Sequence, residues 1–170
     1  MSDWLTDFLA EFKPFAAGVL GVQWPQLNNT VSILTTVQGV QHNFVEMLNG
    51  TAGTDWQFVL PGFIIDIGKF TEKPDELGMS VQSQVRAPFS IVYIQELAPG
   101  TQNTVNSQIF QLKQAIEARP STFQTFTRIE QGQIMSNVDC PINKELLGDA
   151  EVNVICAGLF YSPGFLIQLY

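Results

Sequence analysis

Hydrophobic positions in the second half of the chain follow the two periods that distinguish strands from helices. Two long apolar stretches come first, a helical stripe follows, and an apolar strand pattern then resumes. The strands are Phe58–Gly68, Met79–Leu97, Ala150–Tyr161 and Phe165–Tyr170, and the helix is Asn103–Arg119. Together with a helix at the N-terminus, this pattern predicts an α+β fold. We expect a mixed or antiparallel β-sheet packed by one main amphipathic helix plus the N-terminal helix.

Proline and glycine interrupt the first two predicted strands. Pro61–Gly62 lies inside Phe58–Gly68 and indicates either an edge strand or a bulge near its start. The polar segment Lys69–Gly78 should be the tip of a hairpin. Within it, Lys73–Pro74–Asp75 is a favourable turn sequence.

The predicted helix has the clearest pattern in the chain. Its apolar residues recur at spacings of four, three and four, and they are Val105, Ile109, Leu112 and Ile116. Asn103 or Thr104 can cap its N-terminus, and Pro120 should stop it after Arg119. We therefore expect one narrow apolar stripe to lie on the sheet.

The last apolar segments predict a second hairpin. Val152, Val154 and Cys156 alternate with Asn153 and Ile155, as in a strand. Pro163–Gly164 should turn the chain, so that Phe165–Tyr170 pairs back on Val152–Leu159.

A helix is predicted over residues 1–20, and its apolar stripe comprises Trp4, Leu5, Phe8, Leu9 and Phe12. Asp7, Glu11 and Lys13 should take the opposite face. Pro14 either kinks this helix or ends its first part. Packing against the sheet is the favoured role of the stripe, and docking on a neighbouring subunit is the alternative.

Residues 21–53 are harder to interpret. Val31–Val37 alternates like a half-buried strand, and Gln38–Gly39 can turn the chain into a second strand, Val40–Leu48. A helix over part of this region is the alternative. We interpret the chain as a single domain over 1–170, with an inserted hairpin within 21–53 and an α+β frame over 54–170.

Composition narrows the classes of function. The chain has 170 residues, enough for one well-packed domain, and only 14% of them are charged. An uncharged polar surface desolvates more easily than an ionic one and suits permanent contacts, although it also fits a compact protein of modest solubility. The net charge of −8 argues against binding nucleic acid or anionic membranes. It is compatible with an acidic wall that repels a passing duplex.

The sequence indicates neither a secretory signal peptide nor a membrane-spanning segment. The N-terminal MSDWLTDF carries acids where a signal peptide carries bases. The apolar run Phe58–Ile67 is too short to span a bilayer. We expect a soluble protein that works or is assembled inside a cell.

Residues with chemical reactivity are few and scattered. His42 is the single histidine, so neither a zinc site nor a serine nucleophile with its base is indicated. Cys140 and Cys156 are expected to be reduced, with a bridge as the less favoured alternative. Asp66 should face solvent. We expect no metal, no cofactor and no enzymatic activity.

The order of elements resembles the tail terminator and tail completion (neck) proteins of tailed bacteriophages. The resemblance covers roughly Trp56–Tyr170, and Ala16–Gly53 departs from it as an apparent insertion. The segments that carry it are the Leu60-Pro61-Gly62-Phe63 strand entry, Phe89–Gln95, Val105–Arg119 and Val152–Leu159.

This resemblance implies a structural virion protein. Such proteins share an α+β fold and usually form a hexameric ring that caps the tail tube and connects it to the neck beneath the capsid. It therefore implies contacts with copies of itself, with the tail tube protein and with neck or connector proteins. DNA would pass through the channel without specific binding. The implied location is the virion tail or neck, and the host cytoplasm during assembly.

Candidate subunit contacts lie on the N-terminal helix and the first hairpin tip: Trp4, Phe8, Phe12, Lys69, Lys73, Asp75 and Glu76. Two other interpretations stay open. One is another tail or neck subunit, such as a tube, baseplate or connector adaptor protein. The other is a small intracellular α+β domain that binds a ligand or acts as an enzyme.

Overall fold

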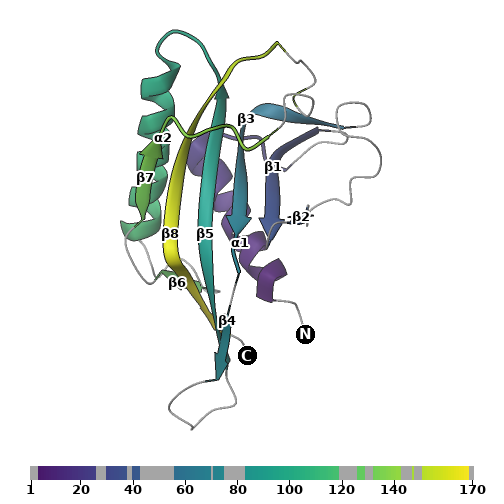
Figure 1. Cartoon of the computed structure of the whole chain (residues 1–170), viewed down its shortest axis with the longest axis vertical. Coiled ribbons are helices and arrows are strands. Elements are labelled where there is room, and N and C mark those ends of the chain that lie inside the picture. The colour runs from purple at the N-terminus through teal and green to yellow at the C-terminus, as the bar shows by residue number, and fades with distance from the viewer. Residues whose placement is uncertain are drawn as a thin grey trace.

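The fold is described from a computed structural model, which defines residues 4–25, 30–37, 40–42, 56–69, 71–74, 83–118, 126–128, 132–142, 147 and 151–168. Two helices lie among these residues, α1 (Trp4–Leu20) and α2 (Thr101–Ala118). The strands are β1 (Thr30–Val37), β2 (Val40–His42), β3 (Gln57–Ile67), β4 (Thr71–Pro74), β5 (Ser83–Glu96), β6 (Phe126–Arg128), β7 (Gln133–Ser136) and β8 (Val154–Gln168). Figure 1 shows their arrangement.

All the described strands belong to one sheet. It has eight strands in the order β2-β1-β3-β5-β8-β6, with β4 also beside β5 and β7 also beside β8. β1 and β3 run parallel, and the other described pairs are antiparallel. Both helices pack on one face of this sheet (Figure 1). The predicted fold class, a mixed sheet with two helices, is therefore confirmed.

Helix α1 lies on the sheet through the predicted apolar stripe. The side chains of Leu5, Phe8, Leu9 and Phe12 are buried in the core. The ring centroid of Phe12 lies 4.8 Å from that of Phe89 on β5, in an edge-to-face contact that adds to the burial. Packing against the sheet, the favoured role of this stripe, is confirmed for these four residues.

The same helix corrects two expectations. Pro14 lies inside α1, which continues to Leu20, so the helix does not end at the proline. Lys13 was expected on the outer face, but its side chain is only 1% exposed. Leu9, Lys13 and Ala17 share one face because they follow at intervals of four residues. That face is packed along the whole helix.

Helix α2 has the buried stripe predicted for it. Val105, Ile109, Leu112 and Ile116 are each at most 1% exposed. The helix begins at Thr101, before the predicted caps. Gly100, with φ at +82°, precedes the helix, and its carbonyl accepts the Thr104 N–H at 3.3 Å. The predicted helix end at Arg119 and Pro120 lies outside the described residues.

Strand β3 contains the predicted bulge but is not at an edge. Val31 of β1 pairs with Phe58, whereas Ile33 pairs with Phe63, so β3 accommodates extra residues around Pro61–Gly62. A side chain at Gly62 would collide with the Phe58 ring and lie 2.6 Å from the Ser32 carbonyl oxygen. Since β3 lies between β1 and β5, the edge alternative is wrong.

The structure corrects both predicted hairpin turns. Thr71–Pro74 forms β4 and pairs with residues 83–86, so Lys73–Pro74 belongs to a strand. The rest of that tip, residues 75–82, lies outside the described residues. Pro163–Gly164 does not reverse the chain, because β8 continues through it to Gln168. Phe165 pairs with Ala87 of β5, and the register shifts opposite Pro88, which has no N–H to donate.

In residues 21–53, β1 and β2 pair antiparallel in the register of the predicted hairpin, joining Val37 to Val40. Gln38–Gly39 and residues 43–55 lie outside the described part. β1 also pairs with β3, and its residues Val31 and Ile33 are fully buried. The division of the chain at 21–53 and 54–170 stays a prediction.

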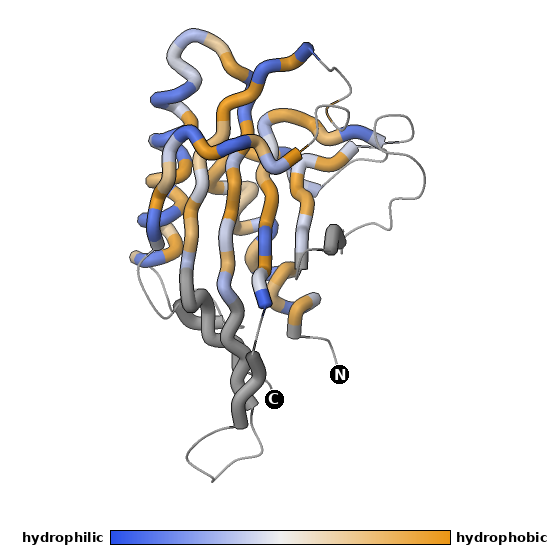
Figure 2. Tube along the Cα trace, viewed as in Figure 1, coloured by the Kyte–Doolittle hydropathy of each residue, from blue (hydrophilic) through white to orange (hydrophobic). Residues whose placement is uncertain are grey.

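The face away from the helices has a second, smaller core. It comprises Val31, Leu34, Phe58, Ile64, Ile94, Ile142 and Cys156. The segment after β7, residues 137–142, crosses in front of the strands on this face (Figure 1). Figure 2 shows hydrophobic runs along the central strands, and neighbouring residues such as Ile64 and Ile65 belong to the two different cores.

Candidate assembly surface

The structure does not gather the predicted contact residues on one surface. Phe8 and Phe12 are inside this chain's own core, where a neighbouring subunit cannot meet them. Lys69 is exposed just after β3. Trp4 lies in α1 and Lys73 in β4, but their side chains are outside the described part. Asp75 and Glu76 are outside it altogether.

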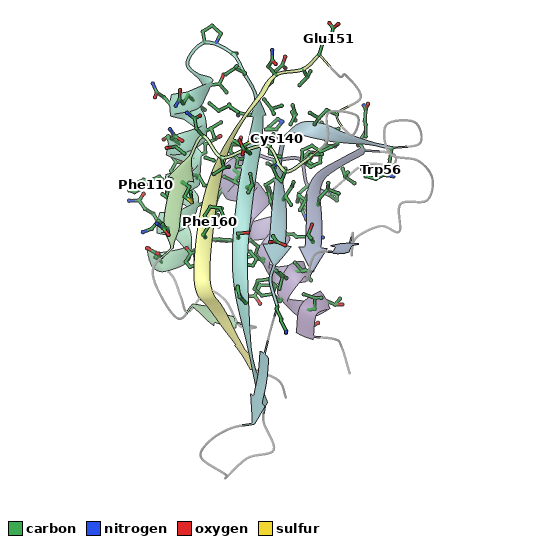
Figure 3. The ribbon with its side chains drawn as sticks, viewed as in Figure 1. Trp56, Phe110, Cys140, Glu151 and Phe160 are labelled. Atoms are coloured by element: carbon green, nitrogen blue, oxygen red, sulfur yellow. The ribbon has the colours of Figure 1, made fainter. Side chains whose placement is uncertain are left out.

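Large exposed apolar side chains indicate a different surface. Among the described residues these are Leu97, Phe110 and Met135, with exposed fractions of 53%, 49% and 49%. Phe110 projects from α2, away from the sheet (Figure 3). Met135 lies on β7, which runs beside α2 at the same edge of the sheet (Figure 1). We call the exposed residues of α2 and β7 the α2–β7 surface.

The helical part of this surface has no exposed charge. The exposed residues of α2 are Gln102, Asn103, Thr104, Ser107, Phe110, Gln111, Gln114 and Ala118. The two charged residues of the helix, Lys113 and Glu117, are partly buried and form an ion pair with an N–O distance of 2.8 Å. Because ions lose more hydration energy than amides or hydroxyls, this surface can be covered at a small desolvation cost.

A hydrogen bond holds the two parts of the surface together. Glu117 accepts the backbone N–H of Gly132 at 2.6 Å through its second carboxylate oxygen. Gly132 immediately precedes β7, so the start of that strand is tied to the last turn of α2. The helix and the strand are thus fixed relative to each other. Met135 itself faces the other side of the sheet, because its neighbour Ile134 packs in the helix-side core and successive strand residues alternate between faces.

Sequence reasoning missed this surface, although one signal was present. Phe110 is apolar and lies one position after Ile109, outside the stripe that faces the sheet. A single exposed aromatic residue is common on protein surfaces, so this signal gains weight only with the uncharged residues around it on α2. Met135 gave no comparable signal, because the hydrophobic pattern did not predict a separate strand at this position.

Exposed charges elsewhere are mainly acidic. Among the residues whose side-chain exposure the structure describes, Asp66, Glu96, Asp139 and Glu151 are exposed acids and Lys69 is the exposed cation. The solvent-facing position predicted for Asp66 is confirmed, and partial desolvation raises the pKa of its carboxyl. Glu96 pairs with Val154, so it lies at the same end of the sheet as Glu151 (Figure 3).

Two buried titratable groups belong to the core. Burial lowers the pKa of Lys13 from 10.5 to about 8. Burial also raises the pKa of Tyr93 to about 12, although a hydrogen bond from Gln95 opposes the shift. The Tyr93 hydroxyl donates to the Leu20 carbonyl at 3.3 Å, which ties β5 to the end of α1.

The described residues contain no group of three or more His, Cys, Asp or Glu side chains placed to hold a metal ion. His42 lies in β2, but its side chain is outside the described part. Neither described helix is long and apolar enough to cross a bilayer. No protein-family model matches the sequence, and no curated protein matches it either.

Proposed function

We propose that this chain is a structural virion protein of a tailed bacteriophage. In this proposal, copies of it form a closed ring that caps the tail tube and connects the tail to the neck. The proposal starts from the resemblance in element order to tail terminators. The observation that carries it further is the uncharged α2–β7 surface with its exposed Phe110.

A ring needs a heterologous interface, in which one surface of each subunit meets a different surface of the next. The α2–β7 surface supplies one side of this contact. The 18 residues of α2 make a strip about 27 Å long and about 10 Å wide. A stable interface takes about 800 Å² from each partner, so β7 and neighbouring residues must join the helix in the contact.

The excess of acidic over basic residues supports a channel through which DNA passes. With a net charge of −8, and with acids outnumbering bases among the exposed side chains that the structure describes, the chain has little to bind phosphate. The end of the sheet with Glu96 and Glu151 is the proposed channel side. There, like charge keeps a passing duplex from adhering.

Electron microscopy of virions that lack this protein tests the proposal. We expect tubes of uncontrolled length, or tails that do not join heads. Normal, head-joined tails without the protein would contradict it. Particles with another defect, such as missing tubes or baseplates, would favour a different tail subunit. Ligand turnover by a monomer would favour the enzymatic alternative.

A matched pair of variants tests the surface. Phe110→Asp places a charge on the α2–β7 surface, and Leu97→Asp places one at an equally exposed apolar residue outside α2 and β7. Both proteins should fold, with similar thermal midpoints. Only Phe110→Asp should reproduce the tail defect. Normal tails from Phe110→Asp would exclude this surface as the subunit contact. The proposed ring would then still be tested by virions that lack the protein.

A further inference from the structure

Cys140 and Cys156 meet on the sheet face away from the helices, although they are far apart in the sequence. Cys156 is a buried residue of β8, and Cys140 is a partly buried residue of the crossing segment that packs against the same apolar cluster. Neither is bridged. We propose that these two thiols are a reversible oxidation site that closes to an intrachain disulfide. This inference does not depend on the proposed function.

Backbone contacts set the position of Cys140. β7 pairs antiparallel with β8, and the chain continues this pairing beyond the strand, because the Val138 N–H donates to the Cys156 carbonyl at 3.2 Å. Two residues later, the Cys140 thiol donates to the Ile142 carbonyl with an S–O distance of 3.5 Å. Figure 3 shows Cys140 where the segment crosses the strands.

Cys140 packs against the apolar cluster that contains Cys156, so the two thiols are neighbours in one cluster. Hydrogen bonding to Cys140 and burial raise the pKa of Cys156, so Cys156 keeps its proton. Since the Cys140 thiol donates to Ile142, its sulfur is available to accept from Cys156. The two sulfur atoms therefore belong to the same packed cluster, from which a disulfide can form.

The different solvent exposure of the two thiols determines which of them is oxidised first. With hydrogen peroxide as oxidant, the partly exposed Cys140 reacts first. The Cys140 thiol gives up its proton as its sulfur attacks one peroxide oxygen. The O–O bond breaks, and the other oxygen leaves as hydroxide, which takes that proton to become water. The product is a sulfenic acid. The Cys156 sulfur then attacks the Cys140 sulfur, the S–O bond breaks, and the departing hydroxide takes the Cys156 proton to become water.

The balance is two thiols oxidised to one disulfide and one hydrogen peroxide reduced to two waters. The new bond would link the 137–142 segment covalently to β8. Among the described residues, the backbone hydrogen bond from Val138 to Cys156 already joins the two. A thiol reductant reverses the reaction by exchange.

The test uses the full native chain treated with equimolar hydrogen peroxide. Intact mass should fall by two hydrogens, and non-reducing peptide mapping should join Cys140 to Cys156 within one chain. Dithiothreitol should restore the original mass. The thermal midpoint should rise by roughly 5–10 °C, because the closed loop restricts the unfolded chain.

Two variants report the order of reaction. In Cys156→Ser, Cys140 should give a sulfenic acid that dimedone traps. In Cys140→Ser, the buried Cys156 should react at least tenfold more slowly. In the unmodified chain, iodoacetamide should likewise alkylate Cys140 at least tenfold faster, which tests the asymmetry without a substitution. Disulfides between chains, or independent oxidation of both thiols without a bridge, would overturn the proposal.

Discussion

The two faces of the sheet are covered in different ways. Helices α1 and α2 cover one face with side chains at regular helical spacing, and the stripe of α2 is at most 1% exposed. The other face is covered by residues 137–142 and Leu147, and several of its side chains, including Cys140 and Val138, are only partly buried. One cover is periodic and closed, whereas the other is irregular and partly open.

The helix-covered face mainly stabilises the fold, whereas the exposed and reactive side chains lie elsewhere. The face under the helices has little left to offer a partner, because its large side chains already contact each other. The other face holds the partly exposed thiol of Cys140 and the buried thiol of Cys156, and the outer side of α2 holds Phe110. We expect substitutions under the helices to affect mainly folding. Substitutions elsewhere should affect mainly assembly or reactivity.

The largest effect is expected under the helices. Leu112→Ala should lower the free energy of unfolding by about 2–5 kcal/mol, because it opens a cavity between α2 and the sheet. Phe110→Ala, two positions earlier on the same helix, is the matched control. It should cost less than about 0.5 kcal/mol because Phe110 is exposed. Urea unfolding of both proteins measures the difference, and equal losses would show that α2 does not pack by its stripe.

The helix-covered face was largely predictable from the sequence. The spacing of Val105, Ile109, Leu112 and Ile116 predicts one buried stripe because helical geometry places them on one side. Lys13 was missed because a charge was assumed to be exposed, whereas its position on α1 is set by neighbours four residues away. The charge of Lys13 suggested an exposed position, but the helical spacing from Leu9 and Ala17 places it in the core.

The other face could not be predicted in the same way. Pro163–Gly164 looks like a turn, but the partner strand has Pro88 at the same level, and both strands continue past the irregularity. Only the pairing between distant segments reveals this. The meeting of Cys140 with Cys156 likewise depends on the register of β7 on β8, which no local pattern contains.

Lys13 provides a pH test of how dry the helix-covered face is. Its pKa falls from 10.5 to about 8 through burial, so between these values the unfolded chain binds its proton and the folded chain does not. Stability from this group therefore rises with pH from about 8 to 10.5, by about 1.4 kcal/mol per unit and about 3 kcal/mol in all.

Replacing Lys13 by Met should remove this dependence and stabilise the protein at pH 7. We expect the difference between the two proteins in urea unfolding to shrink as pH rises from 8 to 10. Tyr93, whose pKa is raised to about 12, opposes stability above pH 10 in both proteins and cancels in the difference. Lys113→Met, which removes the partly buried Lys113–Glu117 ion pair, is the control. A constant difference between pH 7 and 10 would mean that Lys13 is hydrated.

The smallest of these effects is expected on the other face. Ile142 is 6% exposed and packs in the crossing segment beside Cys156. Ile142→Ala should cost about 2 kcal/mol, near the low end for a buried isoleucine, because an irregular segment can move into the space that is left. The same change should loosen the segment locally and speed alkylation of Cys156 by iodoacetamide, whereas Met135→Ala, at an exposed site on β7, should alter neither measurement. A loss equal to that of Leu112→Ala, with no change in Cys156 reactivity, would show that the irregular cover is packed as rigidly as the helices.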